Sequence, residues 1–161
     1  MESNGREEES LYTKEILEFA AIGVQCASLM EQARDKAEFV EQTTKLLPQL
    51  YLVTLRLPAY FYSPESDYIE EHITEEAYEI VRQRLASLLG EEDAYLSAQS
   101  QEMAYSDTPI AAFISEGLAD VYQHVGNLLG ILRDQNEEAL LPAVGRCRYY
   151  FFEYWGQTHL E

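Results

Sequence analysis

The order of hydrophobic and polar residues predicts helices along almost the whole chain. Apolar residues recur every three or four positions, which is the spacing that places them on one face of an α-helix. A first helix is predicted from about Leu11 to Ala33 on this pattern. The two-residue turn signals of β-hairpins are missing. The pattern therefore indicates an all-α protein.

Residues that begin and end helices divide the rest of the first half of the chain. Asp35 can cap a second helix while Glu38 reaches back to it, which is the capping-box arrangement. Pro48 removes a backbone donor and is expected to kink or break this helix, and Pro58 is expected to end it.

Three more helices follow in the second half. Thr74 is expected to cap the third helix and Gly90 to close it. The fourth is predicted to begin at Thr108-Pro109, since proline is favoured at the first helical position. Asn136 opens the fifth.

Together these signals predict one domain, a compact bundle of five main helices over residues 11–161. Residues 1–10 are polar and acidic, and are expected to form a disordered lead-in without the pattern of a secretory signal. No run approaches the ~20 apolar residues that span a bilayer. A chain of 161 residues can bury a core without a disulfide or metal.

Small residues form a strip on each of two predicted helices. Glycine inside a helix costs about 1 kcal/mol relative to alanine, so a strip of this kind indicates that something approaches closely. We therefore predict that the first and fourth helices touch. The strips are Ala20, Gly23 and Ala27 on the first helix, and Ala112, Ala119, Gly126 and Gly130 on the fourth.

The charge balance limits the partners that the protein can have. Eleven Lys and Arg residues oppose 29 Asp and Glu residues, which gives a formal net charge of −18. Such a field repels nucleic acids and anionic membrane surfaces, and it favours encounter with a basic protein partner. Cys26 and Cys147 lie far apart without metal-ligand spacing, as expected in a cytoplasmic protein.

One candidate metal site is a polar stripe on the fourth helix. Glu116, Asp120 and His124 are spaced by four residues, so their side chains follow one face. A carboxylate and a histidine at this spacing can share a divalent ion. The helical wheel places the stripe away from the apolar centre, on the side expected to meet solvent. A solvated polar face is therefore the alternative interpretation.

A second candidate lies in the predicted third helix. The spacing of Glu75, Glu76 and Glu79 resembles the first half of the magnesium motif of MazG-type nucleotide pyrophosphohydrolases. The E-x-x-D pair that completes that motif does not follow at a suitable distance. Acidic residues in a first helical turn are also stabilised by the helix dipole without any ion.

Aromatic residues form two clusters, one before the third helix and one at the end of the fifth. They form either a recognition surface, since tyrosine and tryptophan are favoured at interface hot spots, or two clusters that pack on each other and close the bundle end. The candidate surface residues are Tyr60, Tyr62, Tyr68, Tyr122, Trp155 and His159.

Three stretches carry a family resemblance. They are the residues Leu-Gly-Glu-Glu-Asp-Ala-Tyr at 89–95, Leu-Ala-Asp-Val-Tyr at 118–122 and Tyr-Trp-Gly-Gln-Thr-His at 154–159. They resemble a bacterial family of small acidic all-helical proteins catalogued as a domain of unknown function. The resemblance implies an all-α fold in the bacterial cytoplasm and brings no activity. It singles out Asp120, Tyr122, Trp155, Gly156 and His159. Family members usually carry a basic and an acidic residue where this chain has Gln123 and His124.

The sequence holds no nucleophile motif and no glycine-rich phosphate loop, so it assigns no catalytic residue and no organic cofactor. We therefore expect a non-enzymatic cytoplasmic protein-interaction domain with an acidic, tyrosine-rich surface. The alternative is a metal-dependent hydrolase, similar to nucleotide pyrophosphohydrolases, which uses the helix carboxylates. Monomer and homodimer both stay open.

Overall fold

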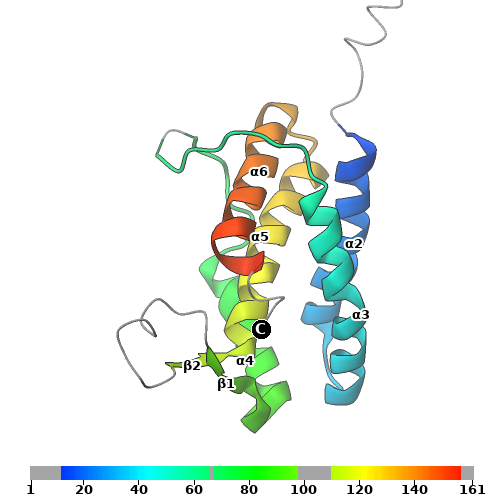
Figure 1. The fold of residues 1–161 in the computed structure, drawn as a ribbon, viewed down its shortest axis with the longest axis vertical. Coiled ribbons are helices and arrows are strands. Elements are labelled where there is room, and N and C mark those ends of the chain that lie inside the picture. Colours follow the sequence, from blue (N-terminus) through cyan, green and yellow to red (C-terminus); the bar gives the residue numbers. More distant parts are fainter. Residues whose placement is uncertain (1–11, 66, 98–109, 157–161) are drawn as a thin grey trace, which may run out of the picture.

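The computed structural model describes residues 12–65, 67–97 and 110–156, and the expected all-α bundle is confirmed (Figure 1). Its helices and short elements are α2 (Lys14–Gln32), α3 (Lys36–Leu55), α4 (Glu75–Leu89), the 3₁₀ turn η1 (Gly90–Asp93), α5 (Ile114–Arg133), α6 (Glu137–Tyr150) and the π-helical turn η3 (Phe151–Trp155). No helix in this part of the chain is long and apolar enough to cross a membrane. The N-terminal lead-in predicted over residues 1–10 lies outside the described residues.

Helix α5 is the centre of the bundle, because it contacts α2, α4 and α6 (Figure 1). Its buried residues point in several directions around the helix. They include Leu118, Val121, Val125, Leu128 and Ile131, together with Ala119, Gly126 and Gly130. A helix that is buried on most sides must be covered by several neighbours. The packing of α5 therefore fixes the positions of the other helices.

The predicted helix boundaries are largely confirmed. The side chain of Asp35 accepts a hydrogen bond from the Ala37 amide at 3.0 Å, and Thr74 accepts one from the Ala77 amide at 3.0 Å. Asn136 caps α6 in the same way. Gly90 ends α4 with φ +59°, a conformation that favours glycine. These polar residues satisfy amides that would otherwise lack a partner in the first helical turn.

Pro48 does not break the second helix, because α3 runs from Lys36 to Leu55 as one helix, and the alternative expectation of a kink at Pro48 stays a prediction. Pro48 is exposed, whereas Leu50 and Val53 in the following turn are buried. The proline removes a single hydrogen-bond donor from the helix. The packing of the apolar face of α3 against α2 keeps the two halves of the helix together despite this loss.

The predicted start of the fourth helix is also wrong. Thr108 and Pro109 lie outside the described residues, and α5 begins only at Ile114. The four residues before it form strand β2 (Ile110–Phe113), which pairs antiparallel with β1 (Ala94–Ser97). Twelve residues separate the two strands, so no short turn marked this pairing in the sequence.

A residue distant in sequence caps α5 in place of the predicted proline. The carboxylate of Asp93 accepts hydrogen bonds from the amide and the hydroxyl of Ser115, each at 2.7 Å. Both residues are buried. The turn after α4 thus supplies the N-terminal cap of α5.

The predicted contact between α2 and α5 is confirmed. A Cβ added at Gly23 would lie 3.0 Å from Cγ1 of Val125. The glycines of α5 meet a different neighbour. A Cβ at Gly126 would lie 2.7 Å from the Ile73 side chain, and a Cβ at Gly130 would overlap the His72 ring. At Gly126 and Gly130 the second strip therefore admits the segment that leads into α4. Ala112, which was expected in the same strip, lies in strand β2 and not in the helix.

Candidate functional site

Two residues of the predicted stripe of Glu116, Asp120 and His124 contact neighbouring helices. Glu116 is exposed. The Asp120 carboxylate accepts a hydrogen bond from the Tyr78 hydroxyl at 2.7 Å. Burial raises the pKa of Asp120 above its usual range, and the hydrogen bond from Tyr78 opposes that rise. Asp120 therefore connects α5 to α4.

His124 was expected to meet solvent, but it is half-buried, because its ring lies against α6. Its ring stacks on Tyr150, with centroids 4.7 Å apart and planes at 21°. Burial and the nearby Arg146 guanidinium lower the pKa of His124 to about 4. The imidazole is consequently neutral near pH 7, and its visible role is aromatic packing.

The acidic residues of α4 lie at its exposed start. Glu75 and Glu76 are exposed, and Glu79 forms an ion pair with Arg82 at 2.8 Å. Glu75, Glu79 and Asp120 line one depression of about 380 Å³ together with Tyr78 and Gln123. Neither these residues nor the α5 stripe forms a group of three metal-ligand side chains among the described residues.

The structure brings together a different set of metal-ligand side chains. Ligand atoms of Glu70, His72 and Asp134 all lie within 4.8 Å of one another, and no other group of three does so in the part of the chain that the structure describes. His72 Nε2 lies 2.6 Å from Oδ2 of Asp134. This hydrogen bond, with help from Arg133, lowers the pKa of Asp134 below its usual range.

His72 is held in place by α5. The buried side chain of Asn127 accepts hydrogen bonds from the main-chain amides of His72 at 2.7 Å and Ile73 at 2.8 Å. Gly130 leaves room for the imidazole. The sequence pattern placed Gly130 in a strip of small residues but did not connect it with His72. The glycine was the signal, and its partner lies in a connection that has no periodicity.

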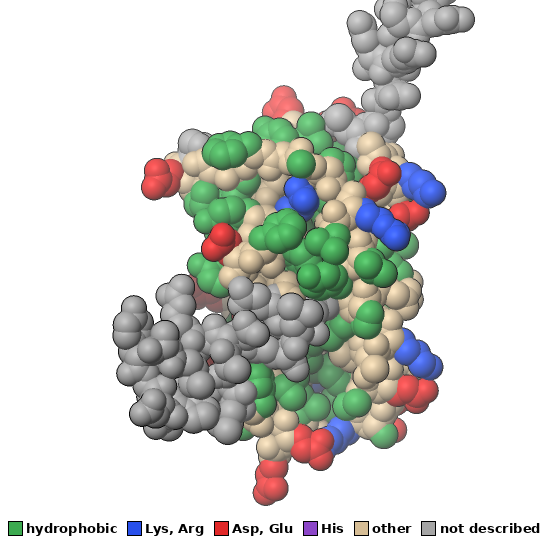
Figure 2. Space-filling view, in the orientation of Figure 1, with side chains coloured by type: hydrophobic (Ala, Val, Ile, Leu, Met, Phe, Trp, Pro, Cys, Tyr) green, Lys and Arg blue, Asp and Glu red, His purple; other side chains and the backbone are tan. Residues whose placement is uncertain are grey.

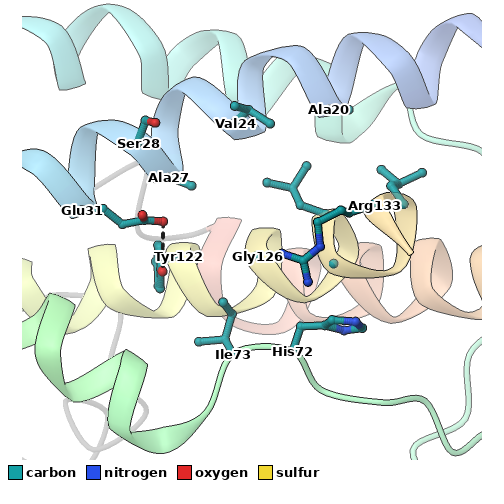
Figure 3. Close-up of a pocket in the computed structure, with 13 residues that line it drawn as sticks. Ala20, Val24, Ala27, Ser28, Glu31, His72, Ile73, Tyr122, Gly126 and Arg133 are labelled. Carbon is teal, nitrogen blue, oxygen red and sulfur yellow. Dashed lines mark hydrogen bonds between the residues drawn. The ribbon is translucent and has the colours of Figure 1, made fainter. Parts of the chain in front are cut away.

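A groove of about 550 Å³ runs between α2 and α5 beside this histidine (Figure 3). Small residues line its middle, among them Ala20, Ala27 and Gly126. At one end the Tyr122 hydroxyl donates a hydrogen bond to Glu31 at 3.1 Å. His72 and Arg133 lie at the other end (Figure 3).

The predicted recognition residues divide into exposed and buried groups. Tyr68 is 98% exposed, and Tyr60 is exposed as well. Tyr122 is buried, and Trp155 is fully buried with its ring N–H donating to the Cys147 carbonyl at 3.3 Å. His159 lies outside the described residues. Tyr122 and Trp155 therefore belong to the packed interior.

The two aromatic clusters contact each other, as one of the two interpretations predicted. The ring of Tyr62 lies 5.6 Å from that of Tyr149 and 6.1 Å from that of Tyr150. Tyr150 in turn stacks on Tyr154 at 5.9 Å. Tyr154 is 60% exposed, and Phe152 and Tyr149 are exposed as well. Packing of the clusters on each other thus leaves an exposed aromatic surface around η3.

A second depression, of about 540 Å³, adjoins this aromatic surface. Its lining includes three tyrosine rings, one proline ring, three carboxylates and one guanidinium, contributed by Tyr62, Tyr68, Tyr150, Pro64, Asp67, Glu70, Glu71 and Arg146. The guanidinium of Arg146 is buried and donates to the carbonyls of Ile69 at 2.9 Å and Glu70 at 3.1 Å. The lining charges therefore sum to a negative value.

The comparison with protein families decides the membership of the chain. Residues 10–161 match the model of a family described as Domain of unknown function (DUF5063). The chain belongs to this family. It is also similar to the crystal structure of protein BF1032 from Bacteroides fragilis, with a TM-score of 0.77 and 29% identity over 93% of this chain and 88% of that chain. None of the curated proteins matches it.

The stretches that carried the family resemblance have structural roles in this chain. Asp93 caps α5, and Asp120 accepts a hydrogen bond from Tyr78 of α4. Tyr122 donates to Glu31 of α2, and Trp155 fills the core below η3. Asp93, Asp120 and Tyr122 thus connect α5 to its neighbours.

Proposed function

We propose that this protein is a non-enzymatic interaction domain that binds a basic protein partner through the aromatic surface around η3. We define this surface as Tyr62, Tyr68, Tyr149, Phe152 and Tyr154. The observation that carries the proposal is that exposed aromatic rings gather on one face of the bundle, where two distant segments of the chain meet.

Ring contacts join Tyr62, Tyr149 and Tyr154 of the aromatic surface through Tyr150. The connection between α3 and α4 passes across α6, and its Tyr62 contacts the rings of Tyr149 and Tyr150 on that helix (Figure 1). Figure 2 shows hydrophobic side chains gathered over the region of η3 and the C-terminal half of α3. Exposed apolar patches of this kind mark interaction sites in soluble proteins. Tyrosine suits such a site because its ring is rigid and its hydroxyl can still bond.

Charge supports a basic partner. The protein carries a formal net charge of −18, and the depression beside the aromatic surface contains three carboxylates against one buried guanidinium. A lysine or arginine side chain in that depression would contact Asp67 and Glu71 and lie against tyrosine rings, which attract cations through their faces. The long-range field would also speed encounter with such a partner.

We also propose that the protein works in the cytoplasm of a bacterium. Cys26 and Cys147 are both buried and unpaired. Burial raises the pKa of the Cys26 thiol to about 12, so this thiol is inert at neutral pH. Free buried thiols are typical of reducing compartments.

The proposal is tested with a surface variant that leaves the core intact. Tyr68→Ser and Tyr154→Ser are combined, since both rings are exposed. The variant and the wild type are titrated with a short arginine- and lysine-rich peptide at low and moderate salt. Hot-spot tyrosines cost about 2 kcal/mol or more when truncated, so the affinity is expected to fall roughly 30-fold.

Ile80→Ser is the matched control, because Ile80 is an exposed apolar residue on α4, outside the aromatic surface. It is expected to bind the peptide like the wild type. Equal affinity of the tyrosine variant and this control would mean that the charge alone attracts the peptide. That result would contradict the aromatic surface as the binding site.

The second candidate, a metal-dependent hydrolase, has one observation in its favour. Glu75, Glu79 and Asp120 come from two helices and line the same depression. Two of these carboxylates already have partners, since Glu79 pairs with Arg82 and Asp120 accepts from Tyr78. An ion would have to displace both partners, and we therefore rank this function second.

A further inference from the structure

Glu70, His72 and Asp134 form a cluster that the proposed interaction surface does not explain. Glu70 and Asp134 are exposed, and their carboxylates approach a histidine whose side chain is only 10% exposed. The three residues come from the connection before α4 and from the end of α5. One imidazole and two carboxylates are a ligand set that divalent transition metals accept.

The fold fixes the histidine before any ligand arrives. Asn127 holds the His72 amide at 2.7 Å, and Gly130 provides the space for the ring. Glycine at this buried helical position costs about 1 kcal/mol of helix stability relative to alanine. Asn127 and Gly130 of α5 thus both help to place the His72 imidazole beside Asp134. A rigid nitrogen ligand with movable carboxylates is an arrangement that suits metal binding.

The hydrogen bonds of His72 are incomplete among the described residues. Nε2 lies 2.6 Å from Oδ2 of Asp134, but Nδ1 is buried and has no hydrogen-bond partner. Nε2 is therefore the ring nitrogen that faces the Asp134 carboxylate, and it is the atom that an ion at the cluster would contact.

The dimensions of the cluster agree with a small ion. A tetrahedral zinc ion with ligands at about 2.0–2.2 Å holds neighbouring ligand atoms about 3.4 Å apart. The ligand atoms here lie within 4.8 Å of one another, with the nearest pair at 2.6 Å. Side-chain rotations that move the two exposed carboxylate oxygens by about an ångström would bring all three ligand atoms into this geometry.

We propose that Glu70, His72 and Asp134 bind a divalent ion of the zinc type at the edge of the groove between α2 and α5. Three protein ligands leave a coordination position for water or for an acidic group of a ligand. Imidazole favours zinc, cobalt or nickel over magnesium and calcium. The site is distinct from the carboxylates of α4 and from the aromatic rings around η3.

Arg133 is the natural competitor of the ion. Its Nε lies 3.5 Å from Oδ1 of Asp134, and its side chain is largely exposed. The guanidinium can therefore turn into solvent when the ion binds. Arg133→Gln removes this competing charge and is expected to strengthen zinc binding.

The test is a calorimetric titration of the EDTA-treated full chain with zinc chloride. One zinc ion is expected to bind per chain. Glu70→Gln and Asp134→Asn are each expected to weaken binding at least ten-fold, and both positions are exposed, so folding is preserved. His72→Ala is expected to abolish binding. A cobalt titration gives a second readout, because a low-symmetry site with a nitrogen ligand develops visible absorption that zinc then removes.

Glu75→Gln is the matched control, since it removes one exposed acidic charge from α4, outside the cluster. It is expected to bind zinc like the wild type. If the net charge of −18 merely attracted cations, zinc binding would weaken equally in Glu70→Gln, Asp134→Asn and Glu75→Gln. Magnesium would then bind as well as zinc. Either of these results would overturn the site. Glu70 also lines the depression beside the aromatic surface, so peptide binding is tested separately, with the tyrosine variant.

Discussion

Gly130→Ala is expected to destabilise the protein, although alanine is the better helix former. A Cβ at this position would lie 2.6 Å from Cβ of His72 and would overlap the ring of that residue. Real Cβ contacts are essentially never this close, so the segment that carries His72 must move away from α5. The hydrogen bonds that Asn127 accepts from His72 and Ile73 would then be strained or lost.

The magnitude follows from opposing contributions. Alanine gains about 1 kcal/mol in helix propensity. Overpacking costs about 1–3 kcal/mol, and weakening one main-chain hydrogen bond costs about 1 kcal/mol more. The net loss is roughly 2 kcal/mol, which lowers the melting temperature of a domain of this size by about 4–8 °C. Thermal unfolding followed by circular dichroism measures this shift.

Two further variants make the measurement specific. Gly23→Ala is the comparison, because its Cβ would meet side-chain methyl groups alone, the nearest being Cγ1 of Val125 at 3.0 Å, and the change in melting temperature is expected to be smaller. Combining Gly130→Ala with His72→Ala should give a coupling energy of about 1 kcal/mol or more, since the second change removes the overlapping ring. A Gly130→Ala protein that melts higher than the wild type would refute the contact between His72 and α5.

Two other changes test the caps and the buried histidine. Asp93→Ala is expected to lower the free energy of unfolding by about 2 kcal/mol, because it leaves the amide and the hydroxyl of Ser115 without their partner at 2.7 Å. Denaturant melts measure this loss, and an unchanged midpoint would contradict the cap that Asp93 forms. His124 has a folded pKa of about 4, below its unfolded value of about 6.5, so its neutral form contributes stability above pH 6.5 that is lost as the pH falls toward 4. The loss of stability amounts to about 3 kcal/mol at most. The variant His124→Phe keeps a ring stacked on Tyr150 and removes the group that titrates. Denaturant melts at pH 7 and pH 4.5 are expected to show a smaller acid loss in His124→Phe, and equal losses in both proteins would count against a buried neutral imidazole.

Local signals in the sequence were enough to predict the helices and most of their ends. Asp35, Thr74 and Asn136 cap their helices through bonds to the next few amides, so their effect depends only on neighbouring residues. The start of α5 depends instead on Asp93, which is 22 positions from Ser115. A contact over that distance leaves no periodic pattern, and the helix was therefore predicted to begin too early.

The candidate site shows the same limit of sequence reasoning. The helical wheel of α5 placed Asp120 and His124 toward solvent, because a wheel describes one helix and contains no information on its neighbours. Tyr78 from α4 and Tyr150 from α6 cover these two residues in the structure. Gly130 correctly indicated a close approach, but its partner His72 lies in an irregular connection that propensities do not place.

The polar residues of α5 each bind a different neighbour, and this has a consequence for experiments on function. Asp120 contacts α4, His124 contacts α6, and Asn127 holds the segment before α4. Changing any of these three residues would destabilise the bundle, and a loss of peptide or zinc binding would then reflect a loss of folded protein. Glu70 and Tyr154 are exposed and lie outside α5. Substitutions at these exposed positions therefore test the metal site and the partner surface without disturbing the core that α5 organises.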